Sequence, residues 1–140
     1  MDIKKFWLGT LAGGVTFFFL GYLIYGVAMM DFFMSHAGSA TGVMKMDDMV
    51  WWALIVGNLS WAAMIAYVFV KWANVKSFSG GLSAAAAIGF FTALGMDLTH
   101  YGTSNIMDLS GALTDVVLST AMTAITGGVI GAVLGMGNKS

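Results

Sequence analysis

Four long apolar stretches, separated by short polar segments, dominate the chain. They cover residues 6–30, 49–70, 82–101 and 111–134, and each is near the twenty residues that a helix needs to cross a bilayer. No proline interrupts any of them. The pattern predicts an all-α fold, a four-helix transmembrane bundle that forms a single transmembrane domain over residues 1–140.

The composition supports a membrane protein. Hydrophobic residues make up 59% of the chain and charged residues only 9%, against about 25% charged residues in soluble domains. The first stretch follows Lys4 and Lys5 like a signal peptide, but it is too long and lacks a small-residue cleavage site, so we expect it to stay as helix one. The lipid bilayer is the expected partner, and a net charge of -1 gives no reason to expect nucleic acid.

Charged residues are segregated between the two sides of this four-pass topology. Six of the seven aspartates and both histidines fall on one side, and five of the six lysines fall on the other. Those lysines are Lys4, Lys5, Lys71, Lys76 and Lys139. Because positive residues stay in the cytoplasm, the pattern predicts cytoplasmic termini and a bacterial inner-membrane location.

Glycines four residues apart occur in the first and fourth stretches. Gly9 and Gly13 form one such pair, and Gly127, Gly131 and Gly135 form two more. This spacing creates shallow grooves that let another helix approach closely. We expect the grooves to serve packing inside the bundle. The alternative is an interface of a homo-oligomer or an accessory subunit of a larger membrane complex, in which Gly131→Leu would break association first.

Two aspartates, Asp97 and Asp115, lie inside predicted membrane spans. An ionisable group there costs a few kcal/mol on insertion scales and usually faces a cavity, a partner or an ion pathway. Two roles remain open: binding a ligand or proton, or structural hydrogen bonding to a neighbouring hydroxyl. His100 lies three residues after Asp97, which places the two side chains on neighbouring parts of one helical face. Asn58 is expected to hydrogen-bond between helices.

These residues predict a polar pocket in the outer half of the bundle. Its candidate ligand-binding residues are Asp97, His100, Asp115, Thr99, Asn58 and Asp31. A small cation or a polar solute is the predicted ligand, which the protein would bind or pass. We expect no enzyme, because the chain has no phosphate-binding glycine loop, no nucleophile elbow and no HExxH zinc motif.

A copper-type metal site is a further alternative, because thioethers favour Cu(I) and imidazole and carboxylate bind divalent ions. The candidate ligands are Met96, His100, Asp97, Met30, Met34 and His36. Otherwise no cofactor is expected. The simpler interpretation treats methionine as an adaptable apolar filler, with Asp47 or Asp48 capping helix two and Asp108 or Ser110 capping helix four.

Residues 89–100, followed by the Leu-Thr-Asp of residues 113–115, resemble small bacterial membrane proteins of domain-of-unknown-function family 2177. Residues 19–26 look more like family 1761. The resemblance implies a four-helix bundle with an Asp-Leu-Thr motif in helix three, matched by residues 97–99, and an aspartate early in helix four, matched by Asp115. It implies no activity, and family 2177 often has asparagine where this chain has a histidine at position 100.

Overall fold

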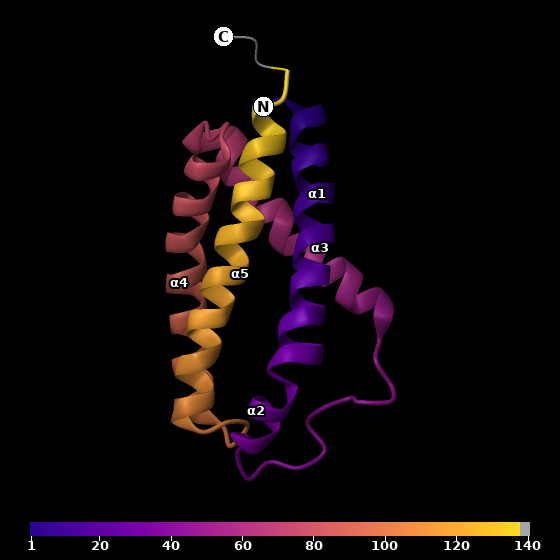
Figure 1. The fold of residues 1–140 in the computed structure, drawn as a ribbon, viewed down its shortest axis with the longest axis vertical. Coiled ribbons are helices and arrows are strands. Elements are labelled where there is room, and N and C mark those ends of the chain that lie inside the picture. The colour runs from indigo at the N-terminus through magenta and orange to yellow at the C-terminus, as the bar shows by residue number, and fades with distance from the viewer. Residues whose placement is uncertain (138–140) are drawn as a thin grey trace.

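The computed structural model describes residues 1–137 and consists of helices joined by turns and one long loop (Figure 1). The elements are α1 (Ile3–Gly21), the π-helical η1 (Tyr22–Ala28), α2 (Met30–Ser35), α3 (Trp51–Val68), the π-helical η2 (Phe69–Ala73), α4 (Phe78–Thr103) and α5 (Leu109–Gly135). Four helical spans are long and apolar enough to cross a membrane. The all-α four-helix prediction is confirmed, and the chain is a multi-pass membrane protein. Lys139, one of the lysines counted above, lies outside the described residues.

Some helix boundaries differ from the sequence prediction, and the N-terminal caps account for them. Helix α4 begins at Phe78, four residues before the expected start, because Ser77 Oγ accepts a hydrogen bond from the Gly80 N–H at 3.1 Å. Asp108 caps α5 by accepting from the Gly111 N–H at 2.8 Å, which confirms one of the two predicted caps. The cap predicted at Asp47 or Asp48 is wrong, since the N-cap position of α3 is Val50, which makes no side-chain cap hydrogen bond.

The first span also ends differently from the prediction. It turns from α-helix to π-helix at Tyr22, breaks at Met29 and resumes as the short α2, whereas one helix to Met30 was expected. A π-helical turn widens the helix and rotates the side chains that follow it. This change in register places Tyr25 toward α5, where it takes part in the site described below.

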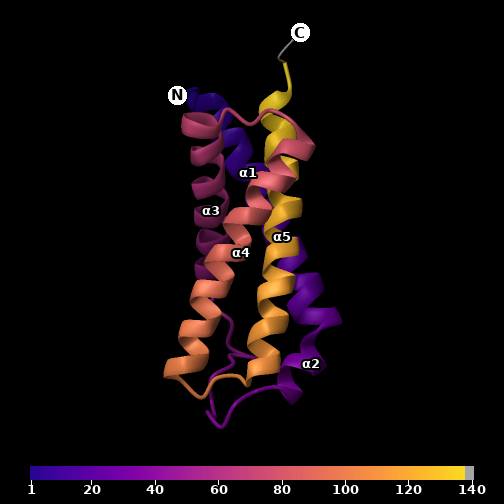
Figure 2. The same cartoon turned by 90° about the vertical axis from the view of Figure 1, so that its left-hand side faces the viewer.

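The helices do not form an even bundle. Helix α4 packs along α5, while α1 packs between α5 and α3. Helix α3 crosses the others obliquely, so its Val68 end lies beside them and its Trp51 end is displaced beyond α1 (Figure 1). Figure 2 shows α3 alongside only one half of the molecule. As a result, α3 and α4 share no extensive contact within residues 1–137.

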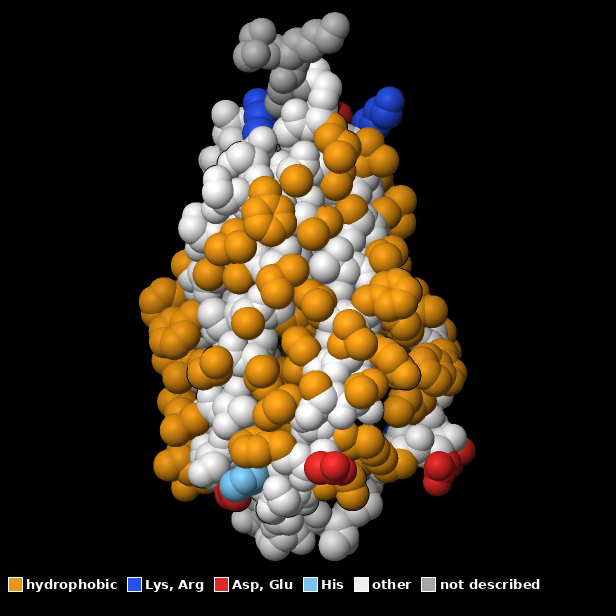
Figure 3. Space-filling view, viewed as in Figure 1, with side chains coloured by type: hydrophobic (Ala, Val, Ile, Leu, Met, Phe, Trp, Pro, Cys, Tyr) orange, Lys and Arg blue, Asp and Glu red, His pale blue; other side chains and the backbone are white. Residues whose placement is uncertain are grey.

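The two ends of the molecule carry opposite charge. We call the end with both termini the lysine end (Lys4, Lys5, Lys71 and Lys76) and the opposite end the aspartate end (Asp31, Asp97, Asp108 and Asp115). Figure 3 shows lysines at the first end, aspartate and histidine at the second, and hydrophobic side chains over the surface between them. The predicted separation of charge is therefore present in the fold.

Close glycine contacts gather at the lysine end. A Cβ at Gly127 would collide with the Cβ of Ala85 and the carbonyl oxygen of Gly81. A Cβ at Gly131 would collide with the Ser77 carbonyl oxygen. Helices α4 and α5 therefore touch backbone to backbone. In α1, a Cβ at Gly13 would lie 2.6 Å from Ile130 Cδ1.

These contacts confirm that the glycine grooves serve packing inside the chain. A leucine at Gly131 would first collide with the backbone of α4 in the same chain, so we expect it to disturb the fold. Its effect on association with another subunit stays a prediction. The buried core, which includes Ile65, Phe69, Ile130 and Leu134, lies at the same end. Helix α3 follows its oblique path away from α4 toward the aspartate end (Figure 1).

A backbone clasp holds the aspartate end together. The Gly38 N–H donates to the Ile106 carbonyl and the Ala40 N–H to the Asn105 carbonyl, both at 2.9 Å. His36 Nδ1 lies 2.8 Å from Asp108 Oδ2. The chain after α2 is thereby attached to the turn that starts α5.

This clasp is expected to weaken in acid. The Gly111 N–H, and then the His36 side chain, hold the pKa of Asp108 below its ordinary value of 3.8. When the pKa of a carboxyl group is lower in the folded protein than in the unfolded chain, the ionised carboxylate stabilises the folded protein. This stabilisation is complete at pH values above the pKa of the unfolded chain, and it is lost as the pH falls through the lowered pKa. Hydrogen exchange, corrected for its intrinsic pH dependence, should show amide protection at residues 38 and 40 unchanged between pH 7 and 5 and lost below 3.8. Unchanged protection in Asp108→Ala at neutral pH would contradict this account.

Candidate functional site

A cleft of about 370 Å³ opens where α3 and α4 diverge. Helices α3, α4 and α5 supply its walls, and Phe17 of α1 is part of its lining. Its apolar lining includes Trp61, Met64, Met96 and Met122. Its polar lining residues are Asn58, Thr92, Asp97, Asp115, Ser119 and Thr123. The volume falls within the range of small-molecule sites, about 300–1,000 Å³.

Two carboxyl groups meet in this cleft because of their positions along antiparallel helices. Asp97 lies six residues before the end of α4, and Asp115 lies six residues after the start of α5. At 1.5 Å per residue, each is about 9 Å from its helix end, so both reach the same depth. Both carboxyl groups line the cleft. Adjacent carboxylates repel one another, and one proton or cation between them relieves the repulsion.

Asp97 is the buried member of the pair. Its residue is 8% exposed, and within residues 1–137 its Oδ2 has no hydrogen-bond partner. A buried polar atom without a partner costs about 1–3 kcal/mol, and more when it is charged. Native proteins retain such groups where a ligand, water or ion satisfies them. The fold therefore presents an unsatisfied acceptor at the cleft.

Asp115, in contrast, already has a partner. The Tyr25 hydroxyl donates to Asp115 Oδ1 at 2.6 Å and lies 2.9 Å from Ser119 Oγ. Tyr25 comes from the π-helical η1, so the irregular helix places its hydroxyl against α5. Sequence analysis missed Tyr25 as a site residue. The available signal was a phenol hydroxyl inside an apolar span, which needs a partner when it is buried.

Removing the Tyr25 hydroxyl should therefore destabilise the protein. Tyr25→Phe leaves Asp115 without its donor from η1, and the loss of a hydrogen bond to a carboxyl group costs about 1.5–3 kcal/mol. Unfolding in detergent, followed by circular dichroism, should show a lower midpoint. Tyr22→Phe is the matched control, since Tyr22 lies in the same segment and is 61% exposed. Equal midpoints for the two variants would contradict the role of this bond.

The structure brings together three of the six predicted ligand-binding residues. Asp97, Asp115 and Asn58 line the cleft. The other three, Asp31, Thr99 and His100, are exposed and are not among the residues that line it. Successive helical residues are about 100° apart, so a residue three positions along is rotated by about 60°. That rotation turns His100 away from the α5 contact of Asp97.

One finer prediction about these residues is wrong. Asn58 Nδ2 donates to the Leu54 carbonyl at 2.7 Å within its own helix, whereas a bond between helices was expected. Thr99 Oγ1 likewise donates to the Gly95 carbonyl of its own helix at 2.6 Å. In both cases the preceding turn offers a carbonyl within reach, which satisfies the polar side chain locally.

The candidate metal ligands are spread over different places. Met96 and Asp97 line the cleft, whereas His36 pairs with Asp108 in the clasp. Met30 lies in α2 at a half-buried position, and Met34 and His100 are exposed. In the part of the chain that the structure describes, no three His, Asp or Glu side chains form a group that could hold a metal ion. Copper binding stays a prediction that these positions do not test.

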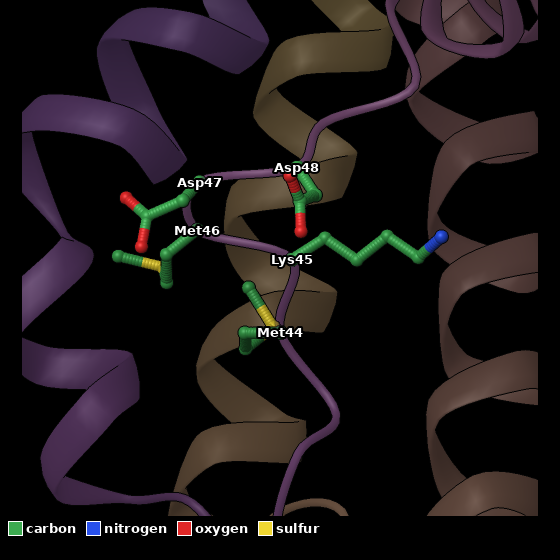
Figure 4. Close-up of a pocket in the computed structure, with 5 residues that line it drawn as sticks. All are labelled: Met44, Lys45, Met46, Asp47 and Asp48. Carbon is green, nitrogen blue, oxygen red and sulfur yellow. The ribbon is translucent and has the colours of Figure 1, made fainter.

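A second hollow lies in the loop before α3, lined by Met44, Lys45, Met46, Asp47 and Asp48. All five residues are exposed. Figure 4 shows Met46 and Asp47 on one side of the loop and the Lys45 side chain extending to the opposite side. Because these side chains do not converge, the cleft between α3 and α4 is the candidate site.

No protein family, curated protein or solved structure matches this chain. The resemblance to families 2177 and 1761 therefore stays a prediction.

Proposed function

We propose that this protein binds a small cation or a polar solute in the cleft between α3 and α4, with no catalytic step. The observation that carries the proposal is the buried Asp97, whose Oδ2 has no partner in the described residues and which lines a cleft large enough for a ligand. Asp115 lines the same cleft at the same depth, so positive charge is the favoured complement of the two carboxyl groups.

Membrane placement supports the same proposal. The lysines at the end with both termini favour a cytoplasmic position for that end under the positive-inside rule. The Asp97 and Asp115 pair then lies in the outer half of a bacterial inner membrane. A ligand would reach it from the outer side or from within the bilayer.

Native mass spectrometry of the protein, extracted gently from its own membrane, tests this proposal. The wild type should carry a reproducible small adduct that Asp97→Asn lacks, whereas Asp31→Asn, which changes an exposed carboxylate, should keep it. An adduct retained in Asp97→Asn, or none in the wild type under conditions that keep lipids bound, would overturn the proposal.

The accessory-subunit alternative rested on glycine grooves available to another protein. Gly127 and Gly131 contact α4 within the same chain, and Gly13 contacts Ile130. That observation therefore supports internal packing, and we do not advance the accessory role as the function.

A further inference from the structure

The ligand of the cleft, given the binding function proposed above, can be specified further. We infer that it is an amphipathic organic cation, a positively charged nitrogen with an apolar body, which reaches Asp97 through the opening between α3 and α4 at the level of the bilayer. Three independent features support this: the size of the cleft, the chemistry of its walls and the position of its opening.

The size of the cleft exceeds what a bare ion needs. A volume of about 370 Å³ equals the share of roughly twelve water molecules in the liquid. Hard cations such as Mg²⁺ and Ca²⁺ need six or more oxygen ligands at short range. Here Asp115 is engaged by Tyr25, and the Thr92 hydroxyl donates to the Ile88 carbonyl at 2.7 Å. In the described residues no three His, Asp or Glu side chains gather into a metal-binding group. Asp97 Oδ2 is the buried carboxyl oxygen without a partner, which suits a single positive charge.

The walls suit an apolar body attached to that charge. Trp61 supplies an aromatic face, and such faces attract organic ammonium groups. Met64, Met96 and Met122 supply flexible, polarisable side chains that adapt to ligands of irregular shape. The lining thus combines one buried, unsatisfied carboxyl with a largely apolar surface.

The opening of the cleft faces the side of the bundle. Trp61 is 43% exposed and Met96 is 49% exposed, although both line the cleft. Trp61 lies ten residues into α3, about 15 Å from its start, which is within the membrane span. A ligand partitioned into the lipid therefore meets the opening directly, whereas a hydrated ion does not.

Gly57 offers a substitution that narrows the opening without disturbing the fold. It lines the cleft, and a Cβ placed there has no neighbouring atom within 4 Å. Gly95 is equally open but is not among the lining residues, so Gly95→Leu is the matched control. The pair separates loss of cleft space from the general effect of adding a leucine to an exposed helical surface.

The test is calorimetric titration of the full chain in detergent with benzyltrimethylammonium, tetramethylammonium, Na⁺, Mg²⁺ and the neutral isostere neopentylbenzene. Titration of Asp97→Asn with the same probes measures the background heat that comes from partition of the ligand into micelles. We expect benzyltrimethylammonium to bind at least tenfold more tightly than tetramethylammonium, because only the former buries a phenyl ring. Gly57→Leu should weaken this binding at least fivefold, and Gly95→Leu should leave it unchanged.

Other results would distinguish the proposed binding function from the inference about the type of ligand. Asp97-dependent binding of tetramethylammonium, Na⁺ or Mg²⁺ that equals or exceeds that of benzyltrimethylammonium would overturn this inference and leave the proposed function standing. If neopentylbenzene bound as tightly as benzyltrimethylammonium, charge would have no role in binding. If Gly57→Leu bound benzyltrimethylammonium as tightly as the wild type, the ligand would not enter between α3 and α4. Either result overturns the inference. No difference between wild type and Asp97→Asn for every probe would overturn both.

Discussion

Replacing Gly127 by leucine is expected to lower the free energy of unfolding by about 3 kcal/mol or more, the upper range for overpacking a tight interior. At this position α5 lies against the backbone of α4, and a Cβ would collide with Ala85 and with the Gly81 carbonyl. Neither obstacle is a flexible side-chain end that can rotate away. The two helices would have to separate along the interface that holds α4 in the bundle.

Unfolding in a detergent series, followed by circular dichroism, measures this effect. Gly95→Leu serves as the control, because a Cβ at Gly95 has no neighbour within 4 Å and leucine forms helix better than glycine. Its unfolding midpoint should stay the same or rise. If Gly127→Leu and Gly95→Leu behaved alike, the close packing of α4 on α5 would be wrong.

Replacing Asp97 by asparagine is expected to abolish cation binding while making the empty protein more stable. The amide removes a buried carboxyl whose Oδ2 has no partner in the described residues. It also supplies an N–H donor in the cleft that Asp115 lines as well. Relief of one unsatisfied buried polar group is worth about 1–3 kcal/mol. Opposite effects on stability and on binding are typical of residues retained for function.

Thermal unfolding without ligand and calorimetric titration with benzyltrimethylammonium measure the two effects on the same samples. Asp31→Asn is the control, since Asp31 is exposed in α2, and it should change neither quantity. A less stable Asp97→Asn protein would indicate that Asp97 holds helices together. That result would favour the purely structural role of this carboxyl.

Apolar length predicted the helices well, because crossing a bilayer fixes both the length and the composition of a span. The glycine spacing also predicted close packing, and the contacts of Gly127 and Gly131 bear this out. The break at Met29 was not predicted. No proline marks it, and the change from α-helix to π-helix at Tyr22 has no signature in the apolar pattern of the span.

The site could be predicted only in part, for a similar reason. An aspartate inside an apolar span is visible in the sequence, so Asp97 and Asp115 were found. Spacing along one helix suggested His100 as their neighbour, but Asp97 shares the cleft with Asp115 of α5, and the hydrogen-bond partner of Asp115 comes from η1. Contacts between helices depend on rotation and crossing angle, and the oblique path of α3 that opens the cleft has no signature in the local pattern (Figure 1).

The central claim is that Asp97 is a buried carboxyl that a cation can reach from the bilayer. Labelling with dicyclohexylcarbodiimide, an apolar reagent that modifies protonated carboxyl groups, tests this directly when peptide mass spectrometry locates the product. The account predicts modification at Asp97, slower modification at Asp115, which is hydrogen-bonded to Tyr25, and protection of Asp97 by benzyltrimethylammonium but not by neopentylbenzene. An unmodified Asp97, or modification that the cation does not slow, would contradict it.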